Sequence, residues 1–434
     1  MGSPRAACFR IDEEGIALRA LLFGIGSAGD VFPFLALGKG LRERGWQVTI
    51  AASPVHAAAV ARAGCDLEPM GTVEDYERLT ANPNLWKPRQ GIRVILGDEG
   101  AAGMIRRQRD LTRSFVSGSG RAVVVASSLA FGARVAREQV GFPLVTTHLA
   151  PVVLRCQKQP PVLTRVLPEG FILRWFPGLA YRLIDRRMAD PLLKPLVEPL
   201  RAETGLAPIS RYMNSWWHSP DRMMLLFPRW FGSPPSLPGQ AIHAGFLYHD
   251  DGARGDDIND LRRFLGNGSA PVAVTLGSAM RHGREILSHV VKACGALGRR
   301  LLILSKDSDQ VPANLPYTVM RVAWAPMGET LPRCAALIHH GGVGTLARAF
   351  QAGIPQVVIP FCHDQPDNSD RVTRMGAGRW ISPWAVRRGG LNRVLGRVLD
   401  HADMKDRCHA LAREIDPKVA IDKACSIVAD ARAG

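Results

Sequence analysis

A chain of 434 residues exceeds what one hydrophobic core usually organises, so we expect two domains of roughly 200 residues each. Hydrophobic residues make up 46% and charged residues 22% of the chain, a composition that excludes a disordered protein. The sequence contains no apolar run of about 18 residues, so we expect no transmembrane helix. The net charge of +16 indicates an anionic partner such as lipid headgroups or a phosphorylated substrate, whereas the lack of zinc-finger spacing, an RNP-type strand or a dense Lys/Arg run argues against nucleic acid.

The N-terminal segment, residues 1–17, carries charged residues and has no apolar core of the kind found in signal peptides. The eight cysteines are scattered and form no C-x-x-C pair, which is typical of reduced thiols. We therefore expect a cytoplasmic protein, and its charge is compatible with peripheral contact with an anionic membrane surface.

Short β-rich runs alternate with helical periodicity through the first half of the chain. The expected strands are 18–23, 47–52, 121–126, 143–147, 223–227 and 241–246, and the expected helices are 33–44, 54–63 and 129–140. Parallel strands need helical crossovers, so this order predicts a parallel sheet with helices on both faces. The region 160–220 interrupts the rhythm and reads as a helical insertion rich in Pro, Trp and Arg.

A polar stretch, 249–268, marks the expected domain boundary. A second alternating series follows, with strands at 271–276, 300–304, 318–322, 335–339 and 356–360. The sequence thus predicts an N-terminal tail (1–17), an N-terminal α/β domain (18–250), a C-terminal α/β domain (251–415) and a final helical segment (416–434) that packs back toward the first domain.

The turn Gly24–Gly29 follows the first strand and matches G-x-G-x-x-G, so it could cradle a phosphate. A dinucleotide site would also need an acid at the end of the second strand, and Ile50–Ser53 has none. A tight turn that brings strand and helix together is at least as good an interpretation.

Asp30 comes next, at the carboxyl end of the first strand, where open α/β sheets place ligands. A carboxylate there can accept a proton from a substrate. It can also cap the helix expected to begin near Pro33, and the local pattern alone favours the cap.

The segment 335–345 is an apolar strand that ends in two histidines and a glycine-rich helix entry. Glycines allow backbone amides to approach a diphosphate, and a helix N-terminus and an imidazole donor add to its binding. A metal site formed by His339, His340 and His363 is less convincing, because adjacent histidines of a strand point to opposite faces. We expect no bound metal.

The strand 356–360 leads into the polar run 361–368, whose carboxylate and amide groups suit sugar hydroxyls. A helix cap before Pro366 is the alternative. The sugar interpretation is preferred because one end of the second sheet would then gather polar groups from several loops, namely Ser278, His339, Thr345, Asp364 and Gln365.

These residues carry a resemblance to a known family. His339–Thr345, followed by Gly353–Pro360 and by Asp364, Gln365 and Asn368, resembles the donor-binding signature of glycosyltransferase family 1. The resemblance implies the GT-B fold, in which two Rossmann-like α/β domains with parallel sheets face each other across a cleft. It also implies an inverting hexosyltransferase that uses a dTDP- or UDP-linked sugar and no other cofactor.

Further elements extend the resemblance over most of the chain. Trp324–Pro326 is similar to the family's W-x-P element, Gly277–Ser278 to its phosphate-contacting turn, and Gly29–Pro33 to the G-[HD]-x-x-P element that holds the general base. The resemblance assigns Asp30 as base, Ser278, His339, Gly341, Gly342, Gly344 and Thr345 to the diphosphate, Trp324 and Met327 to the nucleotide base, and Asp364 and Gln365 to the sugar.

Two positions depart from the family pattern. Many members have Gln after the W-x-P element and a ribose-binding Glu further on, where this chain has Met327 and Ala347. Loss of that acid is compatible with a deoxyribose donor such as a dTDP-sugar, although another ribose contact could compensate.

The acceptor pocket is expected in variable loops of the first domain. Its candidate residues are Ser27, Phe32, Trp175, Phe176 and Trp217. Within the family the likeness is greatest to rhamnosyltransferases of rhamnolipid biosynthesis, which implies a small amphiphilic acceptor for L-rhamnose or glucose. We expect a monomer or homodimer, and the alternatives are an NAD(P)-dependent oxidoreductase and a non-catalytic nucleotide-sugar-binding protein.

Overall fold

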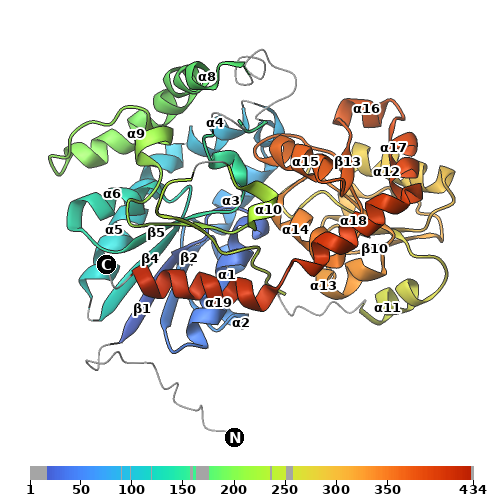
Figure 1. Ribbon diagram of the computed structural model, residues 1–434, viewed down its shortest axis with the longest axis horizontal. Helices are drawn as coiled ribbons and strands as arrows, with labels where there is room; N and C mark the ends of the chain where they lie inside the picture. Colours follow the sequence, from blue (N-terminus) through green and yellow to red (C-terminus); the bar gives the residue numbers. More distant parts are fainter. Residues whose placement is uncertain are drawn as a thin grey trace, which may run out of the picture.

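The computed structural model describes residues 17–88, 90–97, 99–118, 120–156, 160–162, 175–234, 237–250 and 258–431. Two parallel sheets lie side by side in separate lobes, each flanked by helices (Figure 1). The first has the strand order β3-β2-β1-β4-β5-β6-β7 and the second the order β10-β9-β8-β11-β12-β13. This arrangement confirms the predicted α/β architecture of GT-B type.

The strands of the first sheet are β1 (Leu18–Phe23), β2 (Gln47–Ala52), β3 (Asp66–Pro69), β4 (Arg121–Ser127), β5 (Leu144–His148), β6 (Arg222–Leu225) and β7 (Ala241–His243). Those of the second are β8 (Val272–Thr275), β9 (Leu301–Leu304), β10 (Val319–Val322), β11 (Ala336–His339), β12 (Gln356–Val358) and β13 (Gly378–Trp380). Central strands are buried on both faces, as in β1, where Ala20 to Phe23 have no exposed surface, because helices cover both sides of each sheet.

The helices of the first lobe are α1 (Ala28–Arg42), α2 (Ala57–Arg62), α3 (Val73–Ala81), α4 (Gly91–Leu96), α5 (Glu99–Ser117), α6 (Phe131–Val140), α8 (Pro177–Ile184), α9 (Asp190–Ala202) and α10 (Arg229–Gly232). Those of the second are α11 (Ile258–Gly266), α12 (Arg284–Ala296), α13 (Met327–Thr330), α14 (Val343–Ala352), α15 (Gln365–Arg374), α16 (Pro383–Arg387), α17 (Leu391–Asp400), α18 (Ala402–Arg413) and α19 (Pro417–Ala431). Within the described ranges, each helix is too short or too polar to span a lipid bilayer.

Two expectations about elements need correction. The edge strands β3 and β13 were not predicted, because their sequences DLEP and GRW are short and lack an apolar run. The first helix begins at Ala28 rather than near Pro33, because Ser27 and Asp30 form a capping box. Helix α11 begins at Ile258, within the polar stretch 249–268 that was predicted to mark the domain boundary.

The insertion expected at 160–220 is helical in its described part. Helix α8 continues through a π-helical turn, Asp185–Ala189, into α9, and this pair forms the outer rim of the first lobe (Figure 1). The buried carboxylate of Asp185 holds the rim in place, because it pairs with Arg155 and Arg211.

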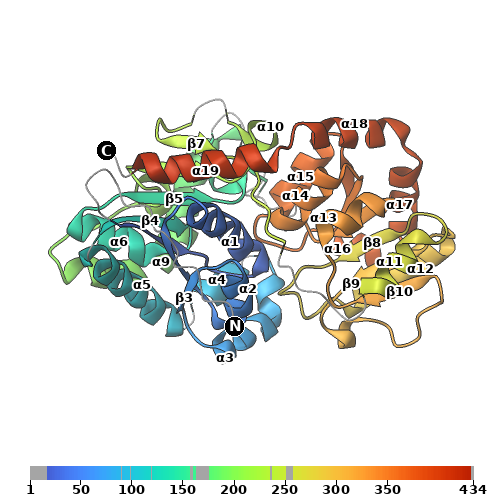
Figure 2. The same cartoon turned by 90° about the horizontal axis from the view of Figure 1, so that it is seen from below.

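Helix α19 crosses from the second lobe and packs on the first (Figures 1 and 2). It lies against α1, β4, β5 and β6. Gly40 of α1 allows the close approach, since a Cβ atom there would lie 2.8 Å from Ile421 and 3.0 Å from Cys425, and Arg44 pairs with Asp422 at the end of the contact. The C-terminal helix thereby ties the two lobes together.

Helices α5 and α6 pack through a glycine, which gives a stability prediction. A Cβ atom on Gly132 would overlap the Ile105 carbonyl and lie 2.6 Å from the Arg109 nitrogen. Because two backbones would have to separate, we expect Gly132→Ala to lower the free energy of unfolding by about 1–3 kcal/mol in urea titrations.

The matched control is Gly103→Ala in α5, where no atom lies within 4 Å of the new Cβ. It should raise stability by about 0.5–1 kcal/mol through helix propensity. Equal effects of the two substitutions would contradict the packing argument.

Candidate active site

Asp30 lies in the first turn of α1, just beyond the carboxyl end of β1. The backbone N–H and the hydroxyl of Ser27 donate to Asp30 Oδ2 at 2.8 and 2.9 Å. Burial raises the pKa of Asp30, and the two hydrogen bonds from Ser27 oppose part of that rise. Asp30 therefore both caps α1 and presents a carboxylate at the edge of the sheet where ligands bind.

The glycine turn before α1 encloses this carboxylate. Gly26 has φ of 131°, and a Cβ atom there would overlap the Asp30 carboxylate. The Asp30 carboxylate occupies the space beside Gly26, which favours the tight-turn interpretation of Gly24–Gly29 over a dinucleotide site.

Two aromatic residues near Asp30 were missed by the sequence analysis. Burial, and secondly the charge of Asp30, raise the pKa of Tyr76 in α3. The ring of His56 meets the Tyr76 ring edge-on at 5.9 Å, and its Nε2 lies 3.4 Å from the Gly26 carbonyl oxygen. No motif joins these positions, since only the parallel sheet brings their loops together.

His339 ends β11 and is fully buried. Its Nε2 lies 3.0 Å from Gln356 Oε1, and its Nδ1 accepts from the Gly341 N–H at 3.1 Å. Burial lowers the pKa of His339 to about 3, so the ring is neutral. Because both ring nitrogens are occupied within the protein, the prediction that His339 donates to a diphosphate needs correction.

His340 differs from His339 in its hydrogen bonding. Its ring lies between two glycine turns, since a Cβ on Gly277 would lie 2.7 Å from the imidazole Cε1 and one on Gly342 would overlap Nε2. Burial lowers the pKa of His340 to about 4, so the neutral ring carries one N–H at pH 7. Its Nδ1 has no hydrogen-bond partner in the described part of the chain, which leaves His340 able to bind a ligand beside α14.

The loop after β12 places Asp364 and Gln365 differently. Gln365 Oε1 accepts from the backbone N–H groups of Phe361 and Cys362 at 2.8 and 3.3 Å, so this oxygen closes the turn. Asp364 accepts at 2.8 Å from Asn368, whose amide also donates to the Gly341 carbonyl at 2.9 Å. Of the two predicted sugar-binding residues, Asp364 is the more accessible.

The two lobes meet at these residues. A Cβ atom on Gly344, in the first turn of α14, would lie 3.6 Å from Gly29 Cα. Burial, and secondly the charge of Asp30, raise the pKa of Asp364 to about 7. A carboxylate of the first lobe therefore faces a carboxyl group and a helix N-terminus of the second.

The other predicted donor residues share one edge of the second sheet. Ser278 follows β8 and is exposed, Thr345 lies in the first turn of α14, and Trp324 and Met327 follow β10 and are partly buried. Since the strands are parallel, the loops after their carboxyl ends lie along the same edge.

The predicted acceptor residues do not form one group. Phe32 meets His249 edge-on at 5.5 Å, where the chain leaves the first lobe, and the rings of Trp175 and Phe176 are 61% and 63% exposed. Trp217 stacks on His218 at 5.9 Å and donates from Nε1 to the Ser128 carbonyl at 2.6 Å. Ser27 and Trp217 thus lie at the ligand-binding edge of the first sheet, while Phe32 packs toward the linker.

A histidine pair beside Trp217 was also missed. His148 ends β5, and its Nε2 lies 2.9 Å from His218 Nδ1. Burial lowers the pKa of both, to about 4 for His218. The pair could not be found from sequence, because His148 and His218 are 70 residues apart and only the fold brings them together.

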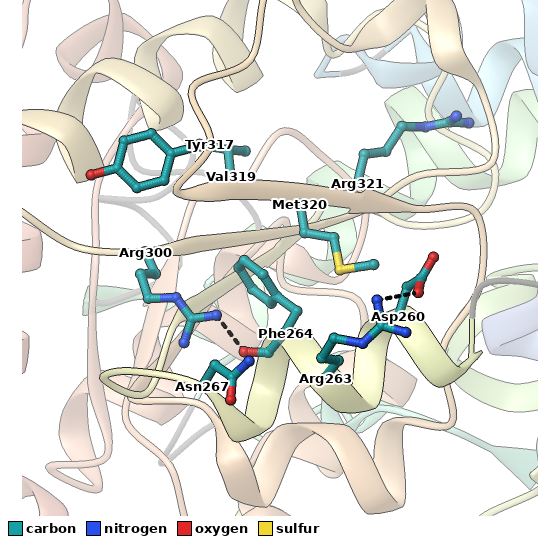
Figure 3. A pocket seen from close by; sticks show the side chains of 9 residues that line it. All are labelled: Asp260, Arg263, Phe264, Asn267, Arg300, Tyr317, Val319, Met320 and Arg321. Atoms are coloured by element: carbon teal, nitrogen blue, oxygen red, sulfur yellow. Dashed lines mark hydrogen bonds and ion pairs between the residues drawn. The ribbon is translucent and has the colours of Figure 1, made fainter.

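A hollow of about 500 Å³ lies far from these groups, between α11 and the edge strand β10 (Figure 3). Its cations are already bonded: Arg300 donates to the Phe264 and Ser269 carbonyls, and Arg263 pairs with Asp260. The described residues contain no group of three or more His, Cys, Asp or Glu side chains that could hold a metal ion.

The partly buried carboxylate of Asp30 in one α/β lobe lies opposite the glycine-rich N-terminus of α14 in the other. This arrangement is typical of two-domain enzymes that transfer a sugar from an activated donor. Residues 20–157 match the N-terminal domain of glycosyltransferase family 28, and residues 288–422 match the C-terminal domain of the erythromycin biosynthesis protein CIII-like family. The chain is 30% identical to the glycosyltransferase GtfC of Amycolatopsis orientalis over 371 residues, 83% of this chain and 85% of that protein.

Further comparisons agree. The O-mycaminosyltylonolide 6-deoxyallosyltransferase of Streptomyces fradiae is 28% identical over 431 residues, 95% of this chain and 97% of that protein. The glycosyltransferase of kitacinnamycin superposes with a TM-score of 0.72 at 20% identity, covering 96% of this chain and 99% of the other. The glycosyltransferase VinC in complex with dTDP gives 0.65 at 18% identity, covering 96% and 100%.

The protein belongs to glycosyltransferase family 1 and has the GT-B fold. It is therefore an enzyme of the hexosyltransferase class that uses a nucleotide sugar, and the comparisons favour this class over the oxidoreductase considered from sequence.

Proposed function

We propose that this enzyme transfers a hexose, L-rhamnose or glucose, from a dTDP- or UDP-linked donor to a hydroxyl group of a hydrophobic or amphiphilic acceptor, with inversion. Asp30 is the general base. The observation that carries the proposal is the position of Asp30, which faces Asp364 and the N-terminus of α14 across the junction of the lobes.

In this mechanism Asp30 removes the acceptor proton as the oxygen attacks the anomeric carbon. The bond to the nucleotide diphosphate breaks on the opposite side, and negative charge develops on the diphosphate. The N-terminus of α14 and the N–H group of the neutral His340 ring stabilise that charge, because fixed dipoles interact more strongly with a charge where water is largely excluded. These groups make a divalent cation unnecessary.

A thymidine donor is favoured over a uridine donor. The side chain of Ala347, at the position of the family's ribose-binding acid, is only 4% exposed and packs in the core of the second lobe. A methyl group cannot form a hydrogen bond with the 2′-hydroxyl of a ribose. A donor with deoxyribose has no 2′-hydroxyl and therefore loses no contact. The VinC structure, which carries dTDP, is in keeping with this choice.

The acceptor side supports an amphiphilic molecule. Trp217 and the neutral pair His148 and His218 combine apolar rings with few polar atoms at the edge of the first sheet. The exposed Trp175 and Phe176 lie on the insertion, where they could meet an acyl chain of a hydroxyalkanoyl type, a macrolide-like natural product or an anionic membrane surface.

Thermal-shift measurements with nucleotides test the donor. A ligand present at 100 times its Kd should raise the free energy of unfolding by about 2.7 kcal/mol. We expect dTDP and dTDP-hexoses to raise Tm most, UDP-hexoses less, and NADH not at all. A rise with NADH, together with none for any nucleotide sugar, would contradict the proposal.

A further inference from the structure

Two histidines of the second lobe hold one short segment of the first. His363 Nε2 donates to the Leu85 carbonyl at 2.9 Å, and His282 Nε2 donates to the Ala81 carbonyl at 3.1 Å. The two accepting residues end α3 and lie in the 3-10 turn Pro83–Trp86. Because a carbonyl can only accept, each ring nitrogen must carry the hydrogen.

The contact of His363 is reinforced from both sides. Trp86 meets the His363 ring edge-on at 6.0 Å and packs against a hydrophobic cluster to which both lobes contribute. Gly91 leaves room for the imidazole, since a Cβ atom there would lie 2.5 Å from its Cε1. Cys362 Sγ adds a second, weaker contact to the Leu85 carbonyl at 3.5 Å.

His363 also has an unusual backbone conformation. Its φ is 59°, in the left-handed region that residues other than glycine adopt uncommonly, although asparagine, aspartate and histidine adopt it more often than the rest. Surrounding contacts help to hold such a conformation. Here the contacts that hold the side chain come from the other lobe.

Both histidines belong to loops that carry proposed donor-binding residues. His363 directly precedes Asp364, the proposed sugar-binding carboxylate, and His282 lies four residues beyond Ser278 in the loop after β8. Residues 81–88 therefore touch the sugar-binding loop and the phosphate-binding loop at the same time.

We propose that residues 81–88 are a closure latch, and that His282 and His363 are positioning residues that align the donor-binding loops only when the lobes are closed. The inference rests on the proposed function, because it assigns Asp364 to the sugar. When the lobes separate, the left-handed turn at His363 loses its support and Asp364 moves away from its place opposite Asp30. The enzyme thus completes its sugar site only in the closed state, where water is excluded.

A pair of double variants tests the latch. The amide nitrogen of glutamine reaches about as far as histidine Nε2, whereas that of asparagine reaches only about as far as Nδ1, and asparagine tolerates the left-handed conformation. The variant H282N/H363N therefore lacks both contacts without backbone strain, and H282Q/H363Q restores them. Both histidines are exposed, so the substitutions leave the hydrophobic cores intact.

We expect H282N/H363N to transfer sugar about tenfold more slowly, to hydrolyse more donor per transfer, and to bind dTDP within about twofold of wild type. Small-angle X-ray scattering of the ligand-free variant should show a larger radius of gyration. H282Q/H363Q should match wild type in all four measurements.

Wild-type transfer and compactness in H282N/H363N would overturn the latch, and so would a parallel loss of dTDP affinity and Tm, which indicates a purely structural role. Failure of the proposed function looks different. In that case the wild-type enzyme consumes no dTDP- or UDP-hexose. The radius of gyration of ligand-free H282N/H363N, compared with that of wild type, still shows whether the latch holds the lobes together.

Discussion

Replacing Asp30 with asparagine should lower kcat at least about 10²-fold, as expected on loss of a general base, while dTDP should bind as tightly as to wild type. The amide keeps the shape of the carboxylate and can still accept from Ser27, so α1 remains capped. What it cannot do is take the acceptor proton. Single-turnover kinetics with saturating donor measure the effect, and retained turnover would assign the base to another residue.

Asp30→Asn has an opposite effect on stability. Burial raises the pKa of Asp30, so the folded state favours its neutral form, and the stability that this preference provides is lost as pH rises above the ordinary value near 3.8. At pH 7 the wild-type protein holds a costly carboxylate that the variant lacks. We expect Tm not to fall in Asp30→Asn, which separates lost catalysis from lost folding.

Ser27→Ala is the matched control. It keeps the base and removes the hydroxyl that donates to Asp30, a bond that lowers the pKa of the carboxylate. The acid limb of the pH–rate profile should move to higher pH, since Asp30 must be ionised to act. The loss of this hydrogen bond to a buried carboxylate should lower the free energy of unfolding by about 1 kcal/mol.

The sequence predicts the scaffold well where the pattern is local. The alternation of apolar strands and helices gives nearly all central strands, because burial on both faces leaves an uninterrupted apolar run. The edge strands β3 and β13 lack such a run, and only their neighbours in the sheet define them. The start of α1 was misplaced because Pro33 was read as its first turn, whereas the capping pair Ser27 and Asp30 sets the true start.

Roles within the site follow a different rule. The sequence indicates that polar residues gather at one sheet edge, but it cannot show which of two adjacent side chains turns inward. The packing of distant loops brings Tyr76 within the electrostatic influence of Asp30 and brings Leu85 into contact with His363. The spacing of these residues along the chain does not predict either pair. Motifs therefore identify the family, and the tertiary structure assigns the individual roles.

The adjacent histidines give the second large effect. His340→Ala should lower kcat/KM for the donor by about 10²–10³-fold, as expected when one preorganised donor to a developing charge is removed. Its neutral ring lies between the turns at Gly277 and Gly342, with Nδ1 unpartnered among the described residues. The affinity for dTDP should fall less than the rate, because charge on the leaving diphosphate grows in the transition state.

His339→Ala should instead lower stability and have little effect on kcat/KM. The ring bonds Gln356 and the Gly341 N–H inside the second lobe, so its removal leaves a cavity and unpaired polar groups that together cost about 2–4 kcal/mol of stability. At a temperature where the variant is folded, its kcat/KM should stay within about tenfold of wild type. Urea unfolding and donor kinetics on both variants distinguish the two roles. If His339→Ala loses catalysis while His340→Ala loses only stability, His339 makes the diphosphate contact. The glycine turns around His340 would then serve packing alone.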